Sequence, residues 1–347
     1  MRADIAILFL AGAFMLCSCR YEPPAEADIV LDLSGAEVLD MTAFPMLTVT
    51  EMDTAVVMGQ VSGASVLDGI AIVKAGKVLY GIDWSTGEVK TRYSRQGRAS
   101  DEYLSLWAAG ADSGLVYIYD MNGKKILFYS ADGDFLRSCS LMETSSENPF
   151  QEAVRLNDSL YVGKRIYGAG DICELSLYDK DFRYVRDIGD FRLRSGIYMG
   201  SPFYRVSDNN ILYCRYMLND IYRLTADTFS VAYRIDFTDK SIPGLSRFKD
   251  EYEIIDFVNE ASDRYAGCVS DIYESPEYFC FTFLSDSRQW YAVYDRASGE
   301  SRVYDLSVPE GMELEKVITA DGKVLAFVSG IKGETQLVCC TIEDFVS

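Results

Sequence analysis

The sequence contains a recurring unit of short strands and tight turns, and this repeat constrains the fold more than any other feature. The clearest copy, Gly114 to Leu141, alternates apolar runs with an Asn-Gly turn and an Asp-Gly turn. Such turns supply the positive φ angle that a hairpin needs. Similar units begin at residues 77, 158, 209, 276 and 321. Each unit therefore predicts a small antiparallel sheet.

The spacing of these units predicts the architecture. Their first strands carry Val78, Val116, Leu160, Ile211, Phe279 and Val324, so the successive gaps are 38, 44, 51, 68 and 45 residues. Propeller blades of four strands repeat at about 40–50 residues. The alternative, a β-sandwich, needs only about seven to nine strands, and the chain has more than twenty candidate runs. We therefore expect an all-β, six-bladed β-propeller with four-stranded antiparallel blades.

Two segments depart from the repeat. The sixth unit lacks one strand, and the extended run from Ala43 to Asp53 has no unit of its own. We expect this N-terminal strand to complete the sixth blade and close the ring, because each blade must pack on two neighbours. The longest gap contains residues 245–265, whose apolar residues lie partly on one helical face. This pattern predicts a helical insertion.

One unit also carries a family pattern. Residues 116–138 follow the order strand, Asp, turn, Ile-x-x-Phe/Tyr, Asp-Gly, strand. In this the chain resembles the six-bladed β-propeller lipoproteins of Gram-negative bacteria that are grouped as TolB-like or NHL-like, over about Ala43 to Asp344. That family usually has a loop Gly-x-Gly-Pro-Gly-Glu-Tyr/Phe after its first blade. The matching stretch here keeps Gly97, Glu102 and Tyr103 and replaces the other three positions.

An apolar run and a cysteine pair stand at the N-terminus. Ile5 to Met15 is an apolar run of 11 residues. This length suits a secretory signal and falls short of the about 20 residues that span a membrane. The following Leu16-Cys17-Ser18-Cys19 resembles the bacterial lipobox, which implies cleavage after Ser18 and lipid attachment at Cys19. The alternative is a structural Cys-x-Cys after a chance apolar leader.

This interpretation divides the chain into three parts. Residues 1–18 are expected to be a signal peptide, residues 19–42 a tether, and residues 43–347 the propeller. We expect an outer-membrane lipoprotein that faces the periplasm or the cell surface. The membrane is then a partner through the lipid on Cys19. An envelope protein or a glycan is the other partner that we expect.

Composition excludes several kinds of chemistry. The chain has 53 Asp and Glu against 33 Lys and Arg, so we expect no nucleic-acid partner. It has no histidine, which excludes Ser-His-Asp and Cys-His catalysis and His-containing metal sites. The acidic turns at Asp120, Asn122, Asp132 and Asp134 lack the spacing of a calcium loop, and turn formation explains them. We therefore expect no metal and no cofactor.

Cysteine usage points to packing rather than chemistry. The chain has nine cysteines, and seven remain if Cys17 is removed and Cys19 is lipidated. An odd number leaves at least one thiol unpaired. Cys280 and Cys339 lie in apolar strand-like runs, which favours buried small hydrophobic residues over metal or redox roles. The sequence does not determine a disulfide pairing.

Four arginines and one tryptophan are the candidate ligand-binding residues. Arg95, Arg98, Arg165 and Arg205 lie near predicted loops, where guanidinium groups at a channel mouth could hold a carboxylate. Surface salt bridges are the alternative for them. Trp107 could form part of a stacking platform for a sugar or a peptide, with packing between blades as the alternative.

The sequence thus favours a binding function and singles out no catalytic residue. We expect a lipid-anchored, non-catalytic binding or scaffold module for a protein, peptide or glycan ligand. The alternative is a carbohydrate-active hydrolase or lyase that uses carboxylates at the central channel. The missing histidine disfavours this alternative, because most propeller hydrolases bring histidines to the channel.

Overall fold

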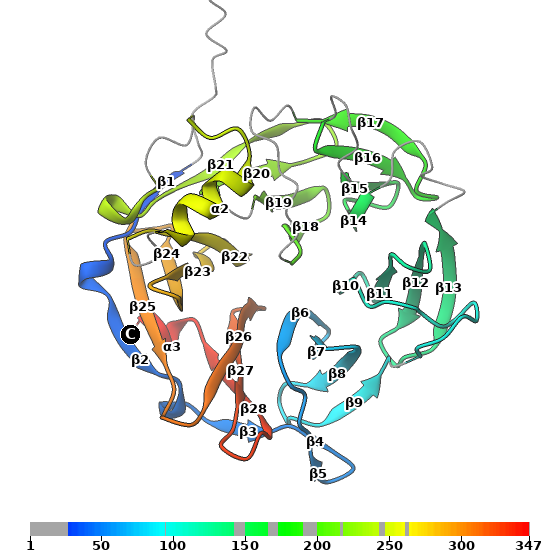
Figure 1. Ribbon diagram of the computed structural model, residues 1–347, viewed down its shortest axis with the longest axis horizontal. Coiled ribbons are helices and arrows are strands. Elements are labelled where there is room, and N and C mark those ends of the chain that lie inside the picture. The colour runs from blue at the N-terminus through cyan, green and yellow to red at the C-terminus, as the bar shows by residue number, and fades with distance from the viewer. Residues whose placement is uncertain are drawn as a thin grey trace, which may run out of the picture.

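The computed structural model describes residues 27–93, 95–141, 150–165, 173–189, 200–215, 218–242, 247–260 and 264–346. Within these residues, six antiparallel sheets stand around a central opening (Figure 1). This arrangement is a six-bladed β-propeller, so the expected fold is confirmed. The proposed signal peptide, with Cys17 and the lipidation candidate Cys19, lies outside the described residues.

Blades 1 to 3 each have four strands, which run in chain order from the channel outward. Blade 1 consists of β6 (Val61–Leu67), β7 (Ile70–Ala75), β8 (Val78–Asp83) and β9 (Val89–Arg92). Blade 2 consists of β10 (Ala108–Asp112), β11 (Leu115–Asp120), β12 (Lys125–Ser130) and β13 (Phe135–Ser140). Blade 3 consists of β14 (Phe150–Arg155), β15 (Leu160–Arg165), β16 (Leu175–Asp179) and β17 (Tyr184–Ile188).

Blades 4 to 6 each include a strand from the N-terminal segment. Blade 4 consists of β18 (Phe203–Ser207), β19 (Asn210–Cys214), β20 (Asp220–Leu224), β21 (Phe229–Asp236) and β1 (Ala27–Val30). Blade 5 consists of β22 (Ala266–Glu274), β23 (Tyr278–Ser285), β24 (Arg288–Asp295), β25 (Ser301–Ser307) and β2 (Glu37–Asp40). Blade 6 consists of β26 (Glu313–Ala320), β27 (Lys323–Ser329), β28 (Thr335–Thr341) and β3 (Met46–Thr48).

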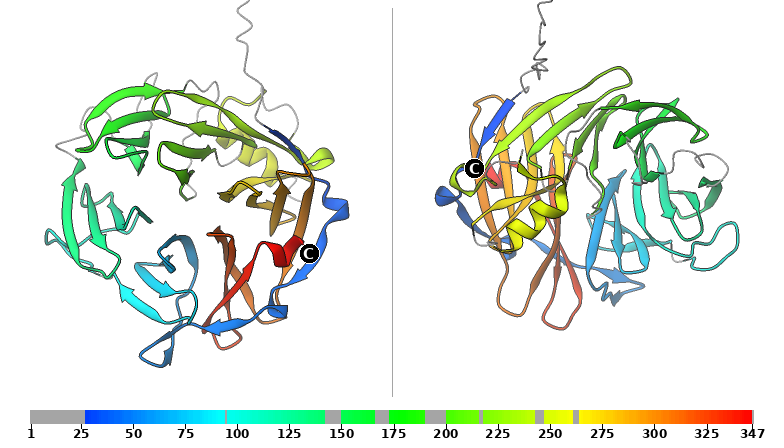
Figure 2. Two further views of the ribbon diagram at one scale, coloured as in Figure 1. Left: turned by 180° about the vertical axis from the view of Figure 1, so that it is seen from behind. Right: turned by 45° about the horizontal axis from the view of Figure 1, so that its top comes forward.

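The N-terminal segment, which we call the belt (residues 27–48), follows the outside of these three blades (Figure 2). Strands β1 and β2 pair in parallel with β21 and β25, and β3 pairs antiparallel with β28. The expected closure of the sixth blade by a strand within Ala43 to Asp53 is therefore confirmed. Part of the expected tether is instead built into the ring, because Ile29 and Leu31 are buried in the core beside blade 4. The belt is linked by two short helical turns, η1 (Leu33–Gly35) and η2 (Met41–Ala43).

One turn chemistry recurs in all six blades and explains the repeat in the sequence. At the end of the third strand, a side-chain oxygen accepts a hydrogen bond from a backbone N–H two to four residues further on. The residues are Asp83, Ser130, Asp179, Thr225, Asp295 and Thr341. Carboxylate and hydroxyl side chains stabilise such turns because they replace a missing backbone acceptor.

Helices are few among the described residues. Helix α2 (Glu251–Asn259) lies between blades 4 and 5, within the insertion expected at 245–265, and Asp250 caps its N-terminus. Its buried Ile254 packs near Leu218 and Ile242. The remaining short elements are η3 (Thr238–Lys240), α3 (Glu343–Val346) and the hairpin of β4 (Thr50–Glu51) and β5 (Thr54–Ala55). No helix in the described part of the chain is long and apolar enough to cross a membrane.

Aromatic side chains hold neighbouring blades together, which accounts for their abundance. Tyr233 of blade 4 stacks on Phe279 of blade 5 with ring centroids 3.9 Å apart. Between blades 2 and 3, the rings of Tyr119 and Phe150 meet edge to face. Within blade 5, Trp290 is 6% exposed and stacks on its cross-strand partner Phe283. The ring therefore closes through apolar contacts between sheets.

The loop after blade 1, residues 97–103, pins blade 1 to blade 2. Tyr103 is buried and donates to the Lys77 carbonyl at 2.8 Å, and the Glu102 carboxylate accepts from the Ala99 N–H at 2.8 Å. A Cβ on Gly97 would overlap that carboxylate, so the Glu102 side chain would have to move if the glycine were replaced. The three residues retained from the family loop therefore have a packing role.

Among the described cysteines, Cys280, Cys339 and Cys340 carry free thiols. Burial raises the pKa of Cys280 to about 12 and, with the nearby charge of Asp344, that of Cys340 to about 12. These thiols stay protonated at neutral pH and are poor nucleophiles. The expected packing role is confirmed for Cys280, whereas Cys339 is only partly buried against the core.

Candidate functional site

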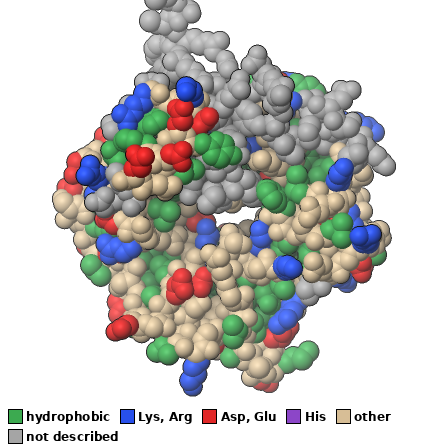
Figure 3. Space-filling model, in the orientation of Figure 1, with side chains coloured by type: hydrophobic (Ala, Val, Ile, Leu, Met, Phe, Trp, Pro, Cys, Tyr) green, Lys and Arg blue, Asp and Glu red, His purple; other side chains and the backbone are tan. Residues whose placement is uncertain are grey.

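A cavity of about 1130 Å³ occupies the middle of the ring. The innermost strands of all six blades, β6, β10, β14, β18, β22 and β26, contribute to its wall. Figure 3 shows the opening of this channel, with Lys and Arg side chains at its edge. Pockets of this kind are the default binding sites of propellers and barrels, because several strands converge there.

Two parts of the cavity wall differ in composition. On blades 1 and 2, residues 62–65 (Ser-Gly-Ala-Ser) and 108–111 (Ala-Ala-Gly-Ala) form what we call the small-residue wall. On blades 4 to 6, polar and ionisable side chains form what we call the charged wall. Its members are Tyr204, Arg205, Asp271, Glu274, Glu315 and Lys316. The first wall leaves space, and the second supplies hydrogen-bonding and charged groups.

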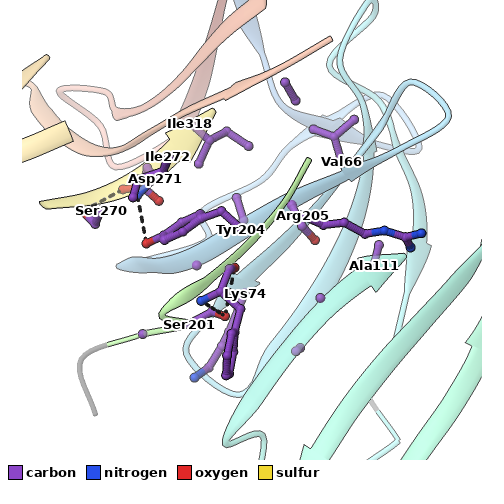
Figure 4. Close-up of a pocket in the computed structure, with 18 of the residues that line it drawn as sticks. Val66, Lys74, Ala111, Ser201, Tyr204, Arg205, Ser270, Asp271, Ile272 and Ile318 are labelled. Atoms are coloured by element: carbon purple, nitrogen blue, oxygen red, sulfur yellow. Dashed lines mark hydrogen bonds between the residues drawn. The ribbon is translucent and has the colours of Figure 1, made fainter. Parts of the chain in front are cut away.

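Asp271 lies at the centre of the charged wall. Strand β22 shifts register on both sides of Ser270, and Asp271 has a φ of 52°, which is uncommon for a residue other than glycine. Its Oδ2 accepts from Lys316 Nζ at 2.6 Å and from the Thr282 hydroxyl at 2.9 Å. Its N–H donates to the Tyr204 hydroxyl oxygen at 3.1 Å (Figure 4). The two bulges thus aim an ion-paired carboxylate into the cavity.

Two tyrosines, Tyr204 and Tyr117, present protonated hydroxyls to the cavity. Burial raises the pKa of Tyr204 well above its ordinary value, and the charge of Asp271 adds to this. Burial, together with the charge of Glu152, also raises the pKa of Tyr117. Gly110 lies opposite Tyr117 in the β10–β11 pair, and a Cβ there would be 2.6 Å from the hydroxyl. Both side chains therefore act as neutral hydrogen-bonding groups at neutral pH.

A buried set of charges leads from the cavity into blades 3 and 4. Glu152 of β14 lines the cavity and is 1% exposed. Lys164 lies opposite it in register, with its Nζ 3.8 Å from Glu174 Oε1. The other oxygen of Glu174 lies 3.0 Å from Arg215 Nε, and all these side chains are buried. Buried charges of alternating sign hold one another in place, and removal of one leaves its partner uncompensated.

Lys74 brings an ammonium group to the same region from blade 1. Its Nζ donates to the Trp107 carbonyl at 2.6 Å. Burial lowers the pKa of Lys74 because it disfavours the charged form, while the negative charge of Glu152 opposes this shift. The Lys74 ammonium is therefore hydrogen-bonded within the protein, to the Trp107 carbonyl.

Arg205, in the middle of β18, links blade 4 to blade 2. Its guanidinium contacts the Asp112 carboxylate, the Asp208 carboxylate and, at 2.7 Å, the Ser113 hydroxyl. Arg155 of blade 3 donates to the same hydroxyl. In Figure 4, Arg205 points away from Tyr204, as successive residues of a strand do. Arg205 is thus bound by carboxylates of its own chain.

The structure brings together two of the five candidate ligand-binding residues. Arg205 and Trp107 both line the cavity, and Trp107 is 40% exposed. Arg95 and Arg98 lie exposed in the loop after blade 1, where Arg95 forms a 3.0 Å ion pair with Asp101. Arg165 ends the second strand of blade 3 and pairs with Asp187 at 3.2 Å. These last three lie outside the cavity wall.

Of the acidic turn residues, Asp120 has the local structural role that the sequence predicted. Asp120 is fully buried, and its carboxylate accepts from the N–H groups of Leu104, Ser105 and Gly123. Within the described ranges, no cluster of three Asp, Glu or Cys residues is arranged to hold a metal ion.

Several residues of the wall were missed at the level of sequence, namely Tyr117, Glu152, Tyr204, Asp271 and Lys316. One signal could have found three of them, namely Glu152, Tyr204 and Lys316, which lie on innermost strands. In these blades the innermost strand precedes the first strand of the predicted unit, so a polar residue in that preceding strand is a candidate for the channel wall. Tyr117 lies on β11, the second strand of blade 2. The bulges that turn Asp271 inward have no comparable signal, because they depend on how β22 pairs with β23.

The fold and the channel define this protein as a six-bladed β-propeller with a polar central cavity. The chain belongs to the family described as "Domain of unknown function (DUF4934)", whose model matches residues 65–346. No protein among the curated ones matches this chain.

Two solved structures share this architecture. A protein of Bacteroides fragilis NCTC 9343, named "Putative exported protein", has a TM-score of 0.69 and 16% identity, covering 91% of this chain and 99% of that one. A member of the DUF4221 family from Bacteroides vulgatus ATCC 8482 has a TM-score of 0.57 and 8% identity, covering 85% of this chain and 96% of that one. At such identities the likeness shows the fold alone.

Proposed function

We propose that this protein is an exported, lipid-anchored propeller of the cell envelope that binds a ligand in its central channel without turnover. The main observation in support of binding is the cavity of about 1130 Å³. Its wall includes the small-residue wall, protonated tyrosines and an exposed tryptophan. The cations of the cavity wall are bound within the chain, which suits a preorganised binding site.

The envelope location is the second part of this proposal. It rests on the apolar run at Ile5 to Met15, the lipobox-like cysteine at Cys19 and the name of the similar Bacteroides fragilis protein. The proposal also assigns the protein to the TolB-like or NHL-like lipoproteins and locates it in the outer membrane. The partner there is the membrane itself, through the lipid.

Paired cysteine substitutions test the anchor. Cells that express Cys19→Ser, grown with a labelled fatty acid, should give protein without label, because the acceptor thiol is gone. Cys17→Ser is the matched control and should incorporate label as the unaltered chain does. Equal labelling of both variants would show that Cys19 is not the lipid site.

A channel-blocking substitution tests the binding role. Ser62 is exposed and lines the cavity, so Ser62→Trp adds bulk without crowding the core. Binding of neutral oligosaccharides, uronate oligosaccharides and short peptides is measured by calorimetry on the full chain in detergent. A ligand that binds the unaltered chain and not Ser62→Trp supports the channel. No binding, or binding that the block leaves unchanged, contradicts it.

The second candidate function is a carbohydrate-active hydrolase or lyase. It is favoured by one observation, the left-handed backbone at Asp271, because strained residues collect at functional sites. Product release from glycans by the unaltered chain, lost in Asp271→Asn or Glu152→Gln, would support this function and oppose binding without turnover. If the unaltered chain releases no product from any glycan, the result contradicts the hydrolase or lyase function.

A further inference from the structure

The polar groups of the cavity point to one ligand class, and this step rests on the proposed binding role. We infer that the channel binds a neutral oligosaccharide. Three features of the wall support this inference, namely an exposed indole, two neutral phenols, and an excess of carboxylates over cations that are already paired.

The indole of Trp107 provides a stacking surface. Trp107 precedes β10 at the edge of the small-residue wall and is 40% exposed, whereas Trp290 is buried. Its backbone is fixed from two sides, since its N–H donates to the Tyr119 carbonyl at 3.1 Å and its carbonyl accepts from Lys74. The apolar face of a pyranose ring packs on such an indole, while its hydroxyls remain available to polar neighbours.

The two phenols supply hydrogen bonds without charge. The hydroxyl of Tyr117 makes no hydrogen bond to any residue in the described part of the chain, and it lies against Gly110, where a Cβ would be 2.6 Å from it. The hydroxyl oxygen of Tyr204 accepts from the Asp271 N–H, so its own O–H is left as a donor. Because burial keeps both phenols protonated, they suit alcohol and ring oxygens.

The charges of the wall disfavour an anionic ligand. Six of the lining residues are Asp or Glu and three are Lys or Arg. Each of the three cations is bound within the chain: Lys316 by Asp271, Arg205 by Asp112, and Lys74 by the Trp107 carbonyl. A uronate would have to displace these partners and approach the remaining carboxylates. The hydroxyls of a neutral sugar can instead donate hydrogen bonds to these carboxylates without breaking their ion pairs.

A peptide is the other ligand that these groups could admit, and the small-residue wall disfavours it. A peptide needs apolar pockets for its side chains or a free strand edge for its backbone. Residues 62–65 and 108–111 form an even wall of small side chains, which offers no pocket to the side chains of a peptide. Strand pairing does not decide between the ligands, because β6 and β10 stand at the ends of their sheets and keep an unpaired edge. A flat wall opposite polar groups suits a chain of sugar rings.

Calorimetry on the full chain in detergent tests the inference. The probes are cellotetraose, maltotetraose and mannotetraose, with tetragalacturonate and tetralysine as charged counterparts. We expect at least one neutral tetrasaccharide to bind and tetragalacturonate to bind at least about tenfold more weakly, in line with the charge balance. No binding of any neutral probe at millimolar concentration would overturn the inference.

Variants locate the contact. Trp107→Ala should weaken binding of the neutral probe about tenfold or more, and Tyr117→Phe about two- to tenfold, as expected for the loss of one neutral hydrogen bond. Tyr184→Phe, on the outer strand of blade 3, is the matched control and should bind as the unaltered chain does. Unchanged affinity in both channel variants would place the sugar elsewhere and overturn the inference.

The outcomes also separate this inference from the proposed binding role. Tetralysine or tetragalacturonate that binds more tightly than every neutral probe, and is lost in Ser62→Trp, keeps the binding role and overturns the carbohydrate assignment. Failure of all probes contradicts both.

Discussion

Blades 1 and 2 differ from blades 4 to 6 both at the outer edge of the ring and at the channel. Blades 1 and 2 have outer strands, β9 and β13, that end their sheets, and their inner strands carry small residues. Blades 4 to 6 have the belt along their outer edges, and their inner strands carry charged residues. The half with polar groups in its channel is therefore also the half that carries extra strands outside.

This difference indicates that the belt offsets the loss of stability caused by the polar groups that line the channel. Charged side chains in a cavity cost free energy unless they are paired, and bulges weaken strand pairing. Additional strands on the outer edge bury apolar residues of the belt such as Ile29 and Met41, which offsets part of this cost. The small-residue half needs no such support, because its wall contains few polar side chains.

The largest effect is expected where the belt closes the ring. The Val49 N–H donates to the Thr335 carbonyl, so the alternation of an antiparallel ladder places Leu47 at a hydrogen-bonded position opposite Leu337. Leu47→Pro removes that donor and should lower the free energy of unfolding by about 3 kcal/mol or more. Urea unfolding followed by tryptophan fluorescence measures it.

The matched control stands on the other half. Leu136 lies at the register shift of β13, has no registered partner and is 51% exposed. Leu136→Pro should therefore cost clearly less than Leu47→Pro. Equal losses would show that belt closure contributes no more than an open edge.

Much of this fold could be predicted from the sequence, because hairpin turns and apolar alternation are local signals. The spacing of the turns gave six blades, and the missing strand of the last unit predicted β3. The parallel strands β1 and β2 were not predicted. Their runs are only four residues long, and their pairing with β21 and β25 is a contact between distant parts of the chain.

The site could be predicted less well, for a related reason. Trp107 and Arg205 were found by residue type, but Arg95 and Arg165 have the same chemistry and lie outside the cavity. What separates them is the strand they occupy and the direction of the side chain. Conformation at Asp271 depends on two bulges, which no local pattern of residues announces.

A smaller effect is expected at Glu274, in the charged half. Its carboxylate accepts from Arg223 at 2.9 and 3.0 Å and from the Tyr233 hydroxyl at 2.6 Å, and Arg296 lies 3.1 Å away. Burial alone would raise the pKa of Glu274, but these hydrogen bonds and charges together lower it below 4.5. The folded state therefore binds the proton less readily than the unfolded chain does.

The sign of the pH dependence follows. The contribution of this carboxylate to stability is present above pH 4.5, its unfolded value, and is lost as the pH falls through the lowered folded pKa. Glu274→Gln should cost about 2 kcal/mol at neutral pH, with allowance for the partly exposed Arg296. Its difference from the unaltered chain should shrink in acid. A difference that stays constant from neutral pH to pH 3 contradicts the ion-pair explanation.

The smallest effect is expected in the small-residue wall, and it tests whether that wall is needed for space. Gly110→Ala would place a Cβ 2.6 Å from the Tyr117 hydroxyl, at the movable end of that side chain. We expect a loss of about 1 kcal/mol, since overpacking shifts the ring without breaking the strand. Gly63→Ala is the matched control, because its Cβ would meet nothing closer than the Lys74 Cβ at 4.0 Å, and its stability should change by less than about 0.5 kcal/mol. If both alanines are tolerated equally, the glycine opposite Tyr117 is not what keeps the cavity open.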